Sequence, residues 1–179
     1  MRKTLLISAL SAAALSLIAG TASAANGTVN FNGEVVASTC AVANADGSGA
    51  ITVTLPKITA TQLNGAAGKR AGETLFNIDL TDCTPASGQV GVRFVGTPAQ
   101  IDQVRGLFTN TGTAANVGVG VWDQLDAQLR PGENTGGFTA IDTTTGAAKI
   151  PLNAYYVSTG TAVTPGTVTS SGSFELEYK

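Results

Sequence analysis

Hydrophobic and polar residues alternate along most of the chain with a period of two. This period is typical of β-strands that bury one face and leave the other in water. The stretches that predict strands are 35–42, 51–55, 74–83, 89–95, 116–122, 123–129, 150–157 and 167–179. Between them, 57–72 is loop-like, 97–106 suits a short helical turn, and 133–146 is rich in turn residues. Many short strands with few helical stretches favour one antiparallel sandwich with Greek-key connections.

An amphipathic strand is also predicted near the start of the chain, at residues 25–36. Ala25, Gly27, Val29, Phe31 and Gly33 are small or apolar, and every residue between them is polar. Chain ends usually fray unless another part of a structure holds them. A well-formed strand at this position therefore indicates a segment that inserts into a sheet, either its own or that of a neighbour.

The other end of the chain carries the same kind of pattern. The residues of one parity there are Gly166, Val168, Ser170, Gly172, Phe174, Leu176 and Tyr178. Glu175, Glu177 and Lys179 occupy the opposite parity. The chain is thus expected to finish in a strand with one apolar face.

The first 24 residues have the layout of a secretory signal peptide. Arg2 and Lys3 precede an apolar run from Leu5 to Ile18, and Ala22-Ser23-Ala24 forms a small-residue cleavage site. A membrane anchor is the alternative, but the run contains serines and is shorter than the ~20 residues that a spanning helix needs. Cleavage after Ala24 leaves eight basic against twelve acidic residues. What remains suits one domain with a sizeable core.

Cys40 and Cys83 are the two cysteines of the chain. In an exported protein an even pair indicates a disulfide, and two buried free thiols are the alternative. The bridge would close a loop for which the chain-entropy estimate is roughly 3–4 kcal/mol.

The composition argues against an enzyme and against several kinds of binding protein. There is no histidine, which removes the commonest general base and metal ligand. No Cys-x-x-Cys, G-x-S-x-G or phosphate-binding loop occurs, so no metal or cofactor is expected. Charged residues make up 12% of the chain, and no run of Lys or Arg is present to follow a nucleic-acid backbone.

Trp122, Tyr155 and Tyr156 are the aromatic residues to consider for carbohydrate binding. Together they are candidates for a sugar-stacking surface. A core tryptophan with half-buried tyrosines is the favoured interpretation, because this is how such residues usually sit in a sandwich.

In order along the chain, these features resemble the pilins of chaperone–usher fimbriae, and in particular type 1-like major pilin subunits. The matching pieces are the alternating extension with Gly27, the run Phe31-Asn-Gly-Glu-Val-Val36 before Cys40, Asp82-Cys83, Asn116-Val-Gly-Val-Gly-Val121, and a last strand with Gly166 and Tyr178. The resemblance implies an incomplete immunoglobulin-like Greek-key sandwich that lacks its last strand. It also implies three parts: signal peptide 1–24, N-terminal donor-strand extension 25–36, and pilin domain 37–179.

The resemblance also implies a mechanism and partners. Ala25, Gly27, Val29 and Phe31 would insert into a neighbouring subunit, in a groove beside the strand that carries Gly166, Val168, Phe174, Leu176 and Tyr178. The partners would be identical or related pilins, a periplasmic pilus chaperone and an outer-membrane usher, with no nucleic acid and no membrane insertion in the mature form. The product would be an adhesive fimbrium on the bacterial surface.

Two other functions remain open at this point. One is a secreted, monomeric carbohydrate-binding sandwich that uses its N-terminal strand in its own sheet. The other, within the same family, is a minor or adaptor pilin. A protein that folds alone would purify as a stable monomer, whereas an incomplete sandwich would need a chaperone or form rods that resist denaturant.

Overall fold

A computed structural model describes residues 39–133 and 135–179. The expected signal peptide at 1–24 and the expected donor extension at 25–36 lie outside the described residues. The predicted start of the pilin domain at residue 37 lies just before them.

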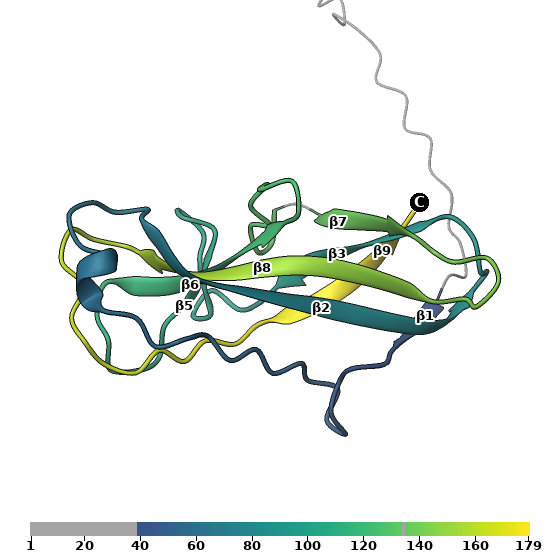
Figure 1. The fold of residues 1–179 in the computed structure, drawn as a ribbon, viewed down its shortest axis with the longest axis horizontal. Helices are drawn as coiled ribbons and strands as arrows, with labels where there is room; N and C mark the ends of the chain where they lie inside the picture. Colours follow the sequence, from purple (N-terminus) through teal and green to yellow (C-terminus); the bar gives the residue numbers. More distant parts are fainter. Residues whose placement is uncertain (1–38, 134) are drawn as a thin grey trace, which may run out of the picture. The chain divides into compact units, whose positions relative to one another are not determined.

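The described chain forms two antiparallel sheets that pack face to face (Figure 1). The elements are β1 Thr39–Val42, a 3₁₀ turn η1 Ala60–Gln62, β2 Arg70–Thr84, β3 Gln89–Val95, β4 Ile101–Asp102, β5 Leu107–Thr109, β6 Val117–Asp123, β7 Thr135–Ala140, β8 Ala148–Ser158 and β9 Ser173–Tyr178. The larger sheet has the strand order β1-β2-β8-β6-β5-β4, and the smaller has β7-β3-β9. The expected antiparallel sandwich is confirmed. None of the helical turns in the described part is long and apolar enough to cross a membrane.

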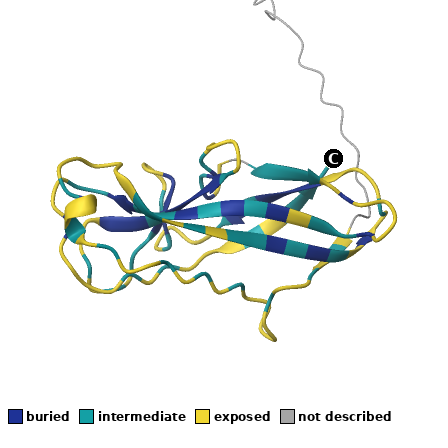
Figure 2. Ribbon diagram, in the orientation of Figure 1, coloured by how far each residue is buried: buried dark blue, intermediate teal, exposed yellow. Residues whose placement is uncertain are grey.

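The core lies between the two sheets and follows the alternation of the sequence. Ile78 and Leu80 of β2 and Ile150 and Leu152 of β8 are fully buried, and Val90 and Val92 of β3 meet them from the smaller sheet. Figure 2 shows the buried and more exposed positions alternating along β2 and β8. Each fully buried aliphatic side chain stabilises the fold by about 1.5–3 kcal/mol.

A disulfide joins Cys40 of β1 to Cys83 near the end of β2. The bond forms alongside the pairing of β1 with β2, in which Thr39 lies opposite Thr84. Cys83 is buried within the main core cluster. The beginning of the described chain is therefore fixed to the larger sheet by a covalent bond as well as by strand pairing.

Two predicted elements near residues 97–129 need adjustment. Residues 97–106 contain the predicted helical turn, closed by a hydrogen bond from the N–H of Gly106 to the carbonyl of Asp102, but this turn caps a tight hairpin in which Ile101 and Asp102 pair with Phe108 and Leu107. Residues 123–129 do not form a strand. The Asp123 carboxylate accepts hydrogen bonds from the N–H groups of Leu125 and Ala127, which folds the chain into a turn. The strand-like structure that remains there is an isolated bridge between Trp122 and Gln128.

One strand was not predicted from the sequence, because glycines interrupt its alternating pattern. Residues 135–140 were predicted to be part of a turn-rich span, yet they form β7 against β3. Gly137 has a φ of +63°, and the register of the pairing shifts between Val90 and Val92, as in a β-bulge. A side chain at Gly136 would meet Leu129, so the strand needs small residues where the core crowds it.

Candidate functional site

A long cavity opens between two extended segments beside β9. Its volume is about 810 Å³. One wall is the segment that follows β1, and the other is the segment that leads into and includes β9 (Figure 1). The floor consists of core side chains from both sheets: Phe76, Ile78, Phe94, Phe108, Val119, Val121 and Ala154. We call this cavity the groove, residues 167–178 its C-terminal wall and residues 51–58 its facing wall.

Strand β9 has an open backbone edge along the groove. It is an edge strand, paired only with β3 in the smaller sheet. Gln89 and Lys179 exchange both of their backbone hydrogen bonds, at 2.8 and 2.9 Å. In an antiparallel pair the bonded positions alternate. The N–H and C=O groups of Phe174, Leu176 and Tyr178 therefore point away from β3, toward the open edge.

The open edge continues before β9, although residues 167–172 are not part of a strand. Thr167 and Thr169 bond to the connection between β5 and β6: their carbonyls accept from the N–H groups of Ala114 and Thr111. The backbone groups of Val168, Ser170 and Gly172 have no hydrogen-bond partner among the described residues. The predicted strand over 167–179 thus starts too early, because β9 begins at Ser173. Odd- and even-numbered residues still alternate over 167–172 in the direction of their backbone groups.

The predicted strand 51–55 lies in the facing wall, and it is not a strand in the structure. Ile51, Val53 and Leu55 point into the groove and are half-buried, whereas Thr52 and Thr54 are exposed. The alternation predicted from the sequence is therefore present. No backbone hydrogen bond to another described residue is formed anywhere in 51–58. The segment has the side-chain pattern of a strand and lacks a partner strand.

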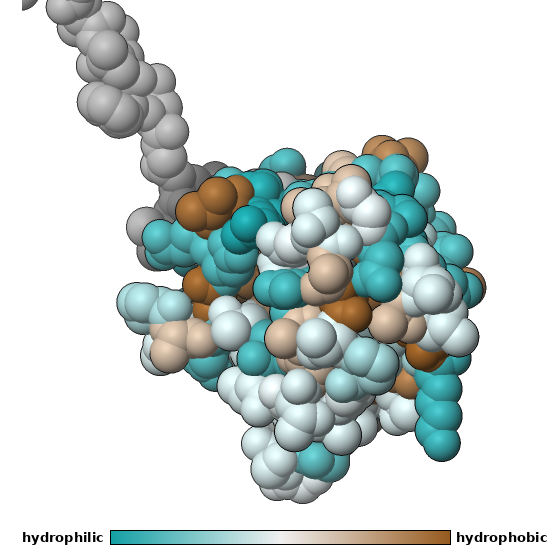
Figure 3. Space-filling view, turned by 90° about the vertical axis from the view of Figure 1, so that its left-hand side faces the viewer, coloured by the Kyte–Doolittle hydropathy of each residue, from teal (hydrophilic) through white to brown (hydrophobic). Residues whose placement is uncertain are grey.

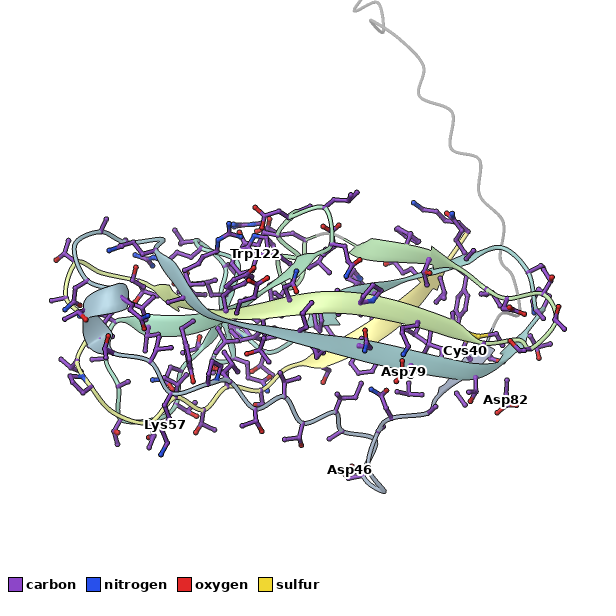
Figure 4. All side chains as sticks on the ribbon, in the orientation of Figure 1. Cys40, Asp46, Lys57, Asp79, Asp82 and Trp122 are labelled. Carbon is purple, nitrogen blue, oxygen red and sulfur yellow. A yellow bond between two sulfur atoms is a disulfide. The ribbon has the colours of Figure 1, made fainter. Side chains whose placement is uncertain are left out.

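A smaller cavity of about 490 Å³, the end pocket, continues the groove past Val168. Ile58, Leu63, Tyr156 and Val163 line it, and Lys57 lies at its rim, labelled at the opposite end of the molecule from Cys40 in Figure 4. Burial raises the pKa of the Tyr156 hydroxyl above its ordinary value, because the charged form would lose its hydration. Figure 3 views the end that carries η1 and shows separate hydrophobic areas among paler residues.

The predicted residues of the C-terminal wall have different positions in the site. Phe174 and Leu176 line the groove, and Val168 lines both the groove and the end pocket. Gly166 lines the end pocket alone, where a side chain would collide with the backbone of Ala114. Tyr178 packs against the main core cluster and is not among the residues that line the groove. Ala25, Gly27, Val29 and Phe31 lie outside the described residues.

Sequence reasoning missed the facing wall and the floor of the groove as parts of the site. The sequence does carry a signal for the facing wall: apolar and polar residues alternate over 51–55, and the alternation ends at Pro56. The floor had none: Phe94 and Phe108 come together edge to face, 5.7 Å between ring centres, only when the two sheets pack. No pattern within one segment reports such a contact.

The groove can bind an apolar strand, and its lining carries no acid–base chemistry. None of the described residues that line it is ionisable. In the loop that precedes the facing wall, the Asp46 carboxylate accepts hydrogen bonds from the Ser48 hydroxyl and from the backbone of Ala50 and Ser48, which lowers its pKa. This bond pattern closes the turn before the facing wall. Within the described part of the chain, no group of three His, Cys, Asp or Glu residues could hold a metal ion.

The aromatic candidates for sugar stacking do not form a shared exposed surface. Trp122 is only 8% exposed and packs edge to face on Tyr155, with ring centres 5.3 Å apart. The Arg70 guanidinium lies over both rings and bonds to Asp126. Tyr156 belongs to another cluster, near the end pocket. The interpretation of Trp122 as a core residue is confirmed.

Comparisons with known proteins agree with this geometry. A family model described as fimbrial protein matches residues 29–179. The chain is 37% identical to the type 1 fimbrial subunit of Klebsiella pneumoniae and 37% identical to the type-1 fimbrial protein A chain of Escherichia coli K12, in each case over 99% of this chain and 98% of the relative.

Solved structures show the same fold. The crystal structure of the P pilus rod subunit PapA matches with a TM-score of 0.57 at 20% identity, covering 78% of this chain and 99% of that one. A subunit in a structure of a chaperone–usher pilus matches with a TM-score of 0.57 at 20% identity, covering 87% and 96%. The expected incomplete immunoglobulin-like sandwich is thereby confirmed. The chain belongs to the fimbrial protein family, whose members are structural rather than enzymatic, and it is a structural subunit of a cell-surface fimbrium.

Proposed function

We propose that this pilin polymerises by donor-strand exchange, in which residues 25–36 of one copy insert into the groove of the next. The observation that carries the proposal is the groove itself. Two walls with apolar side chains turned inward and unpaired backbone groups flank a floor of core side chains. An exposed edge of this kind is a template for another strand.

The backbone of both walls supports the insertion of one strand. Phe174, Leu176 and Tyr178 offer N–H and C=O groups from one side, and residues 51–58 offer theirs from the other. Each hydrogen bond gained adds roughly 0.5–1.5 kcal/mol net. The extension 25–36 also matches the C-terminal wall, residues 167–178, in length. One inserted strand would therefore pair along the whole open edge.

The side chains of the extension suit the groove as well. Ala25, Gly27, Val29 and Phe31 share one parity, so all four turn toward the floor if any one does. Full burial of Val29 and Phe31 would contribute about 1.5–3 kcal/mol each. Gly27 would lie where the groove is shallow, with no room for a side chain. The polar residues between them would face solvent.

A groove that exposes core side chains needs protection before assembly. Residues 1–24 direct the chain to the periplasm as a signal peptide. A periplasmic chaperone pairs one of its own strands with the C-terminal wall and keeps the edge from aggregating. An outer-membrane usher then exchanges that strand for the extension of the next subunit. The resulting homopolymer reaches the cell surface, where it supports adhesion.

Uptake of a synthetic peptide tests this function. A fluorescent peptide with the sequence of residues 25–36 should bind the monomer and then dissociate slowly, because release requires extraction of a paired strand. Fluorescence anisotropy measures both steps. A control peptide with Val29 and Asn30 exchanged, and Phe31 and Asn32 exchanged, has the same composition but puts its apolar residues on the wrong face. Equal uptake of both peptides would contradict the proposal.

The Gly27→Leu peptide should be taken up at least about tenfold more slowly than the natural peptide, because a leucine at this position has no space in the shallow part of the groove. The same anisotropy measurement detects the change. Leucine substituted for Thr28, on the solvent face, is the matched control and should leave the rate within about twofold. An unchanged rate for Gly27→Leu would mean that Gly27 does not face the groove.

A further inference from the structure

The part of the C-terminal wall that precedes β9 has to be held without a partner strand. Strand β3 supports β9 only as far as the pairing of Val95 with Ser173. Residues 167–171 continue beyond that point, and both the groove and the end pocket depend on their position. Their support comes mainly from the connection between β5 and β6, residues 110–116, which is not a strand. The Ser170 hydroxyl also donates to the carbonyl of Thr109 in β5, and the Gln100 amide donates to the Ser171 hydroxyl.

The side chain of Asn110 is at the centre of this support. Its Oδ1 accepts hydrogen bonds from the backbone N–H of Thr169 and from that of Gly112, both at 2.8 Å. Its Nδ2 donates to the carbonyl of Ala114 at 2.7 Å and lies 3.5 Å from the carbonyl of Thr167. One half-buried amide therefore ties the wall to the connection and also fixes the shape of the connection.

Other hydrogen bonds near Asn110 join the same two segments, the connection and the C-terminal wall. The N–H of Thr111 donates to the carbonyl of Thr169, and that of Ala114 donates to the carbonyl of Thr167. Thr113 and Thr167 each donate a backbone N–H to the other's hydroxyl oxygen. Every backbone bond to the wall thus reaches an odd-numbered residue.

This pattern determines which way the wall presents its backbone. In an extended chain, alternate residues direct their N–H and C=O groups to opposite sides. With Thr167 and Thr169 held on the side of the connection, the groups of Val168, Ser170 and Gly172 are turned to the other side. They are in phase with Phe174, Leu176 and Tyr178, whose groups face the groove.

We propose that Asn110 is a positioning residue for strand uptake: it holds residues 167–171 extended and in phase with β9, so that an incoming strand can pair along the whole C-terminal wall. The inference rests on the proposed donor-strand exchange and adds a residue that does not touch the incoming strand. Without the Asn110 amide, the wall before β9 loses its alignment, and an inserted strand pairs only with β9 itself.

The test uses the processed chain, residues 25–179, at low concentration with the peptide of residues 25–36 in excess. Asn110→Ala should slow peptide uptake about tenfold, as expected from the loss of two or three hydrogen bonds. Amide hydrogen exchange by NMR supplies a residue-specific readout. In the natural protein, bound peptide should protect Val168, Ser170 and Gly172 as well as Phe174, Leu176 and Tyr178. In Asn110→Ala the first three amides should stay unprotected, and the last three should be protected.

Asn44→Ala is the matched control. Asn44 also bridges two backbone groups with its side chain, the carbonyl of Asn77 and the N–H of Asp79, but it holds a different part of the chain. Its peptide uptake should stay within about twofold of the natural rate, with all six amides protected. A purely structural role for Asn110 would lower the melting temperature and leave the pattern of protection complete, which would overturn the inference.

A milder variant keeps the test decisive if Asn110→Ala does not fold. Thr167→Val preserves the side-chain volume and removes the hydroxyl that accepts from Thr113. It should weaken protection at Val168 more than at Leu176; uniform protection would contradict the inference. Failure of the natural protein to take up any peptide would instead reject donor-strand exchange, and the inference with it. The two failures are therefore distinguishable.

Discussion

Deleting residues 25–31 should abolish polymerisation while leaving a folded subunit with a functional groove. The deletion removes Ala25, Gly27, Val29 and Phe31, which are the side chains proposed to enter the neighbouring subunit. It leaves β1 and its disulfide to β2 intact, and it touches no residue that lines the groove. Electron microscopy of the cell surface and denaturant-resistant ladders on gels both measure the loss of fibres.

The variant should still accept a strand, and this separates loss of the donor from loss of the fold. The peptide of residues 25–36 should bind it at the natural rate. A matched variant keeps the extension at full length but exchanges Val29 with Asn30 and Phe31 with Asn32. It should also fail to polymerise, because its apolar residues then face away from the floor. Fibres made by either variant would contradict donor-strand exchange.

Alternation in the sequence predicted the long central strands of the larger sheet, β2, β8 and β6, whose partners belong to the described chain. Strand β2 has Ile78 and Leu80 on its buried face, as expected, and β8 has Ile150 and Leu152. In β2 the residues that alternate with them are the polar Asn77, Asp79 and Thr81, so the period of two was clear there. For these central strands, side-chain pattern and backbone pairing agree, and the prediction needed no knowledge of the tertiary structure.

The same rule was wrong for 51–55, and the reason concerns function. Alternation reports which face of a segment is buried, whereas a strand also requires a hydrogen-bonded neighbour. Ile51, Val53 and Leu55 do turn inward, but their backbone has no partner among the described residues. The failed prediction therefore identifies one wall of the groove. Disagreement between pattern and pairing is expected at sites that bind another chain.

Contacts between distant segments set the limit of sequence reasoning here. Residues 167–172 are held by Asn110, Thr111 and Thr113, which are 54 to 59 residues away in the sequence. An asparagine in a connection normally indicates a local turn. Nothing near Asn110 distinguishes that role from a bond to the C-terminal wall. Only the packed sandwich brings the two segments together.

Replacing Phe174 and Leu176 with serine should abolish strand uptake. Both side chains line the groove from β9. Removing either apolar side chain weakens binding by about 1.5–3 kcal/mol, so the double substitution should weaken peptide uptake at least about a hundredfold. The matched control replaces Val104 and Leu125, which are 85% and 90% exposed and do not line the groove, with serine. It should take up peptide at the natural rate.

Mixing the two main variants tests the direction of assembly. The Phe174→Ser, Leu176→Ser variant retains residues 25–36 and can donate, but it cannot accept. The deletion variant can accept, but it cannot donate. Each alone should remain monomeric, and the mixture should stop at a one-to-one heterodimer, detectable by native mass spectrometry. Longer polymers in the mixture would mean that a second route of association exists. No heterodimer, with peptide still taken up by the deletion variant, would mean that a strand attached to a folded subunit cannot enter the groove.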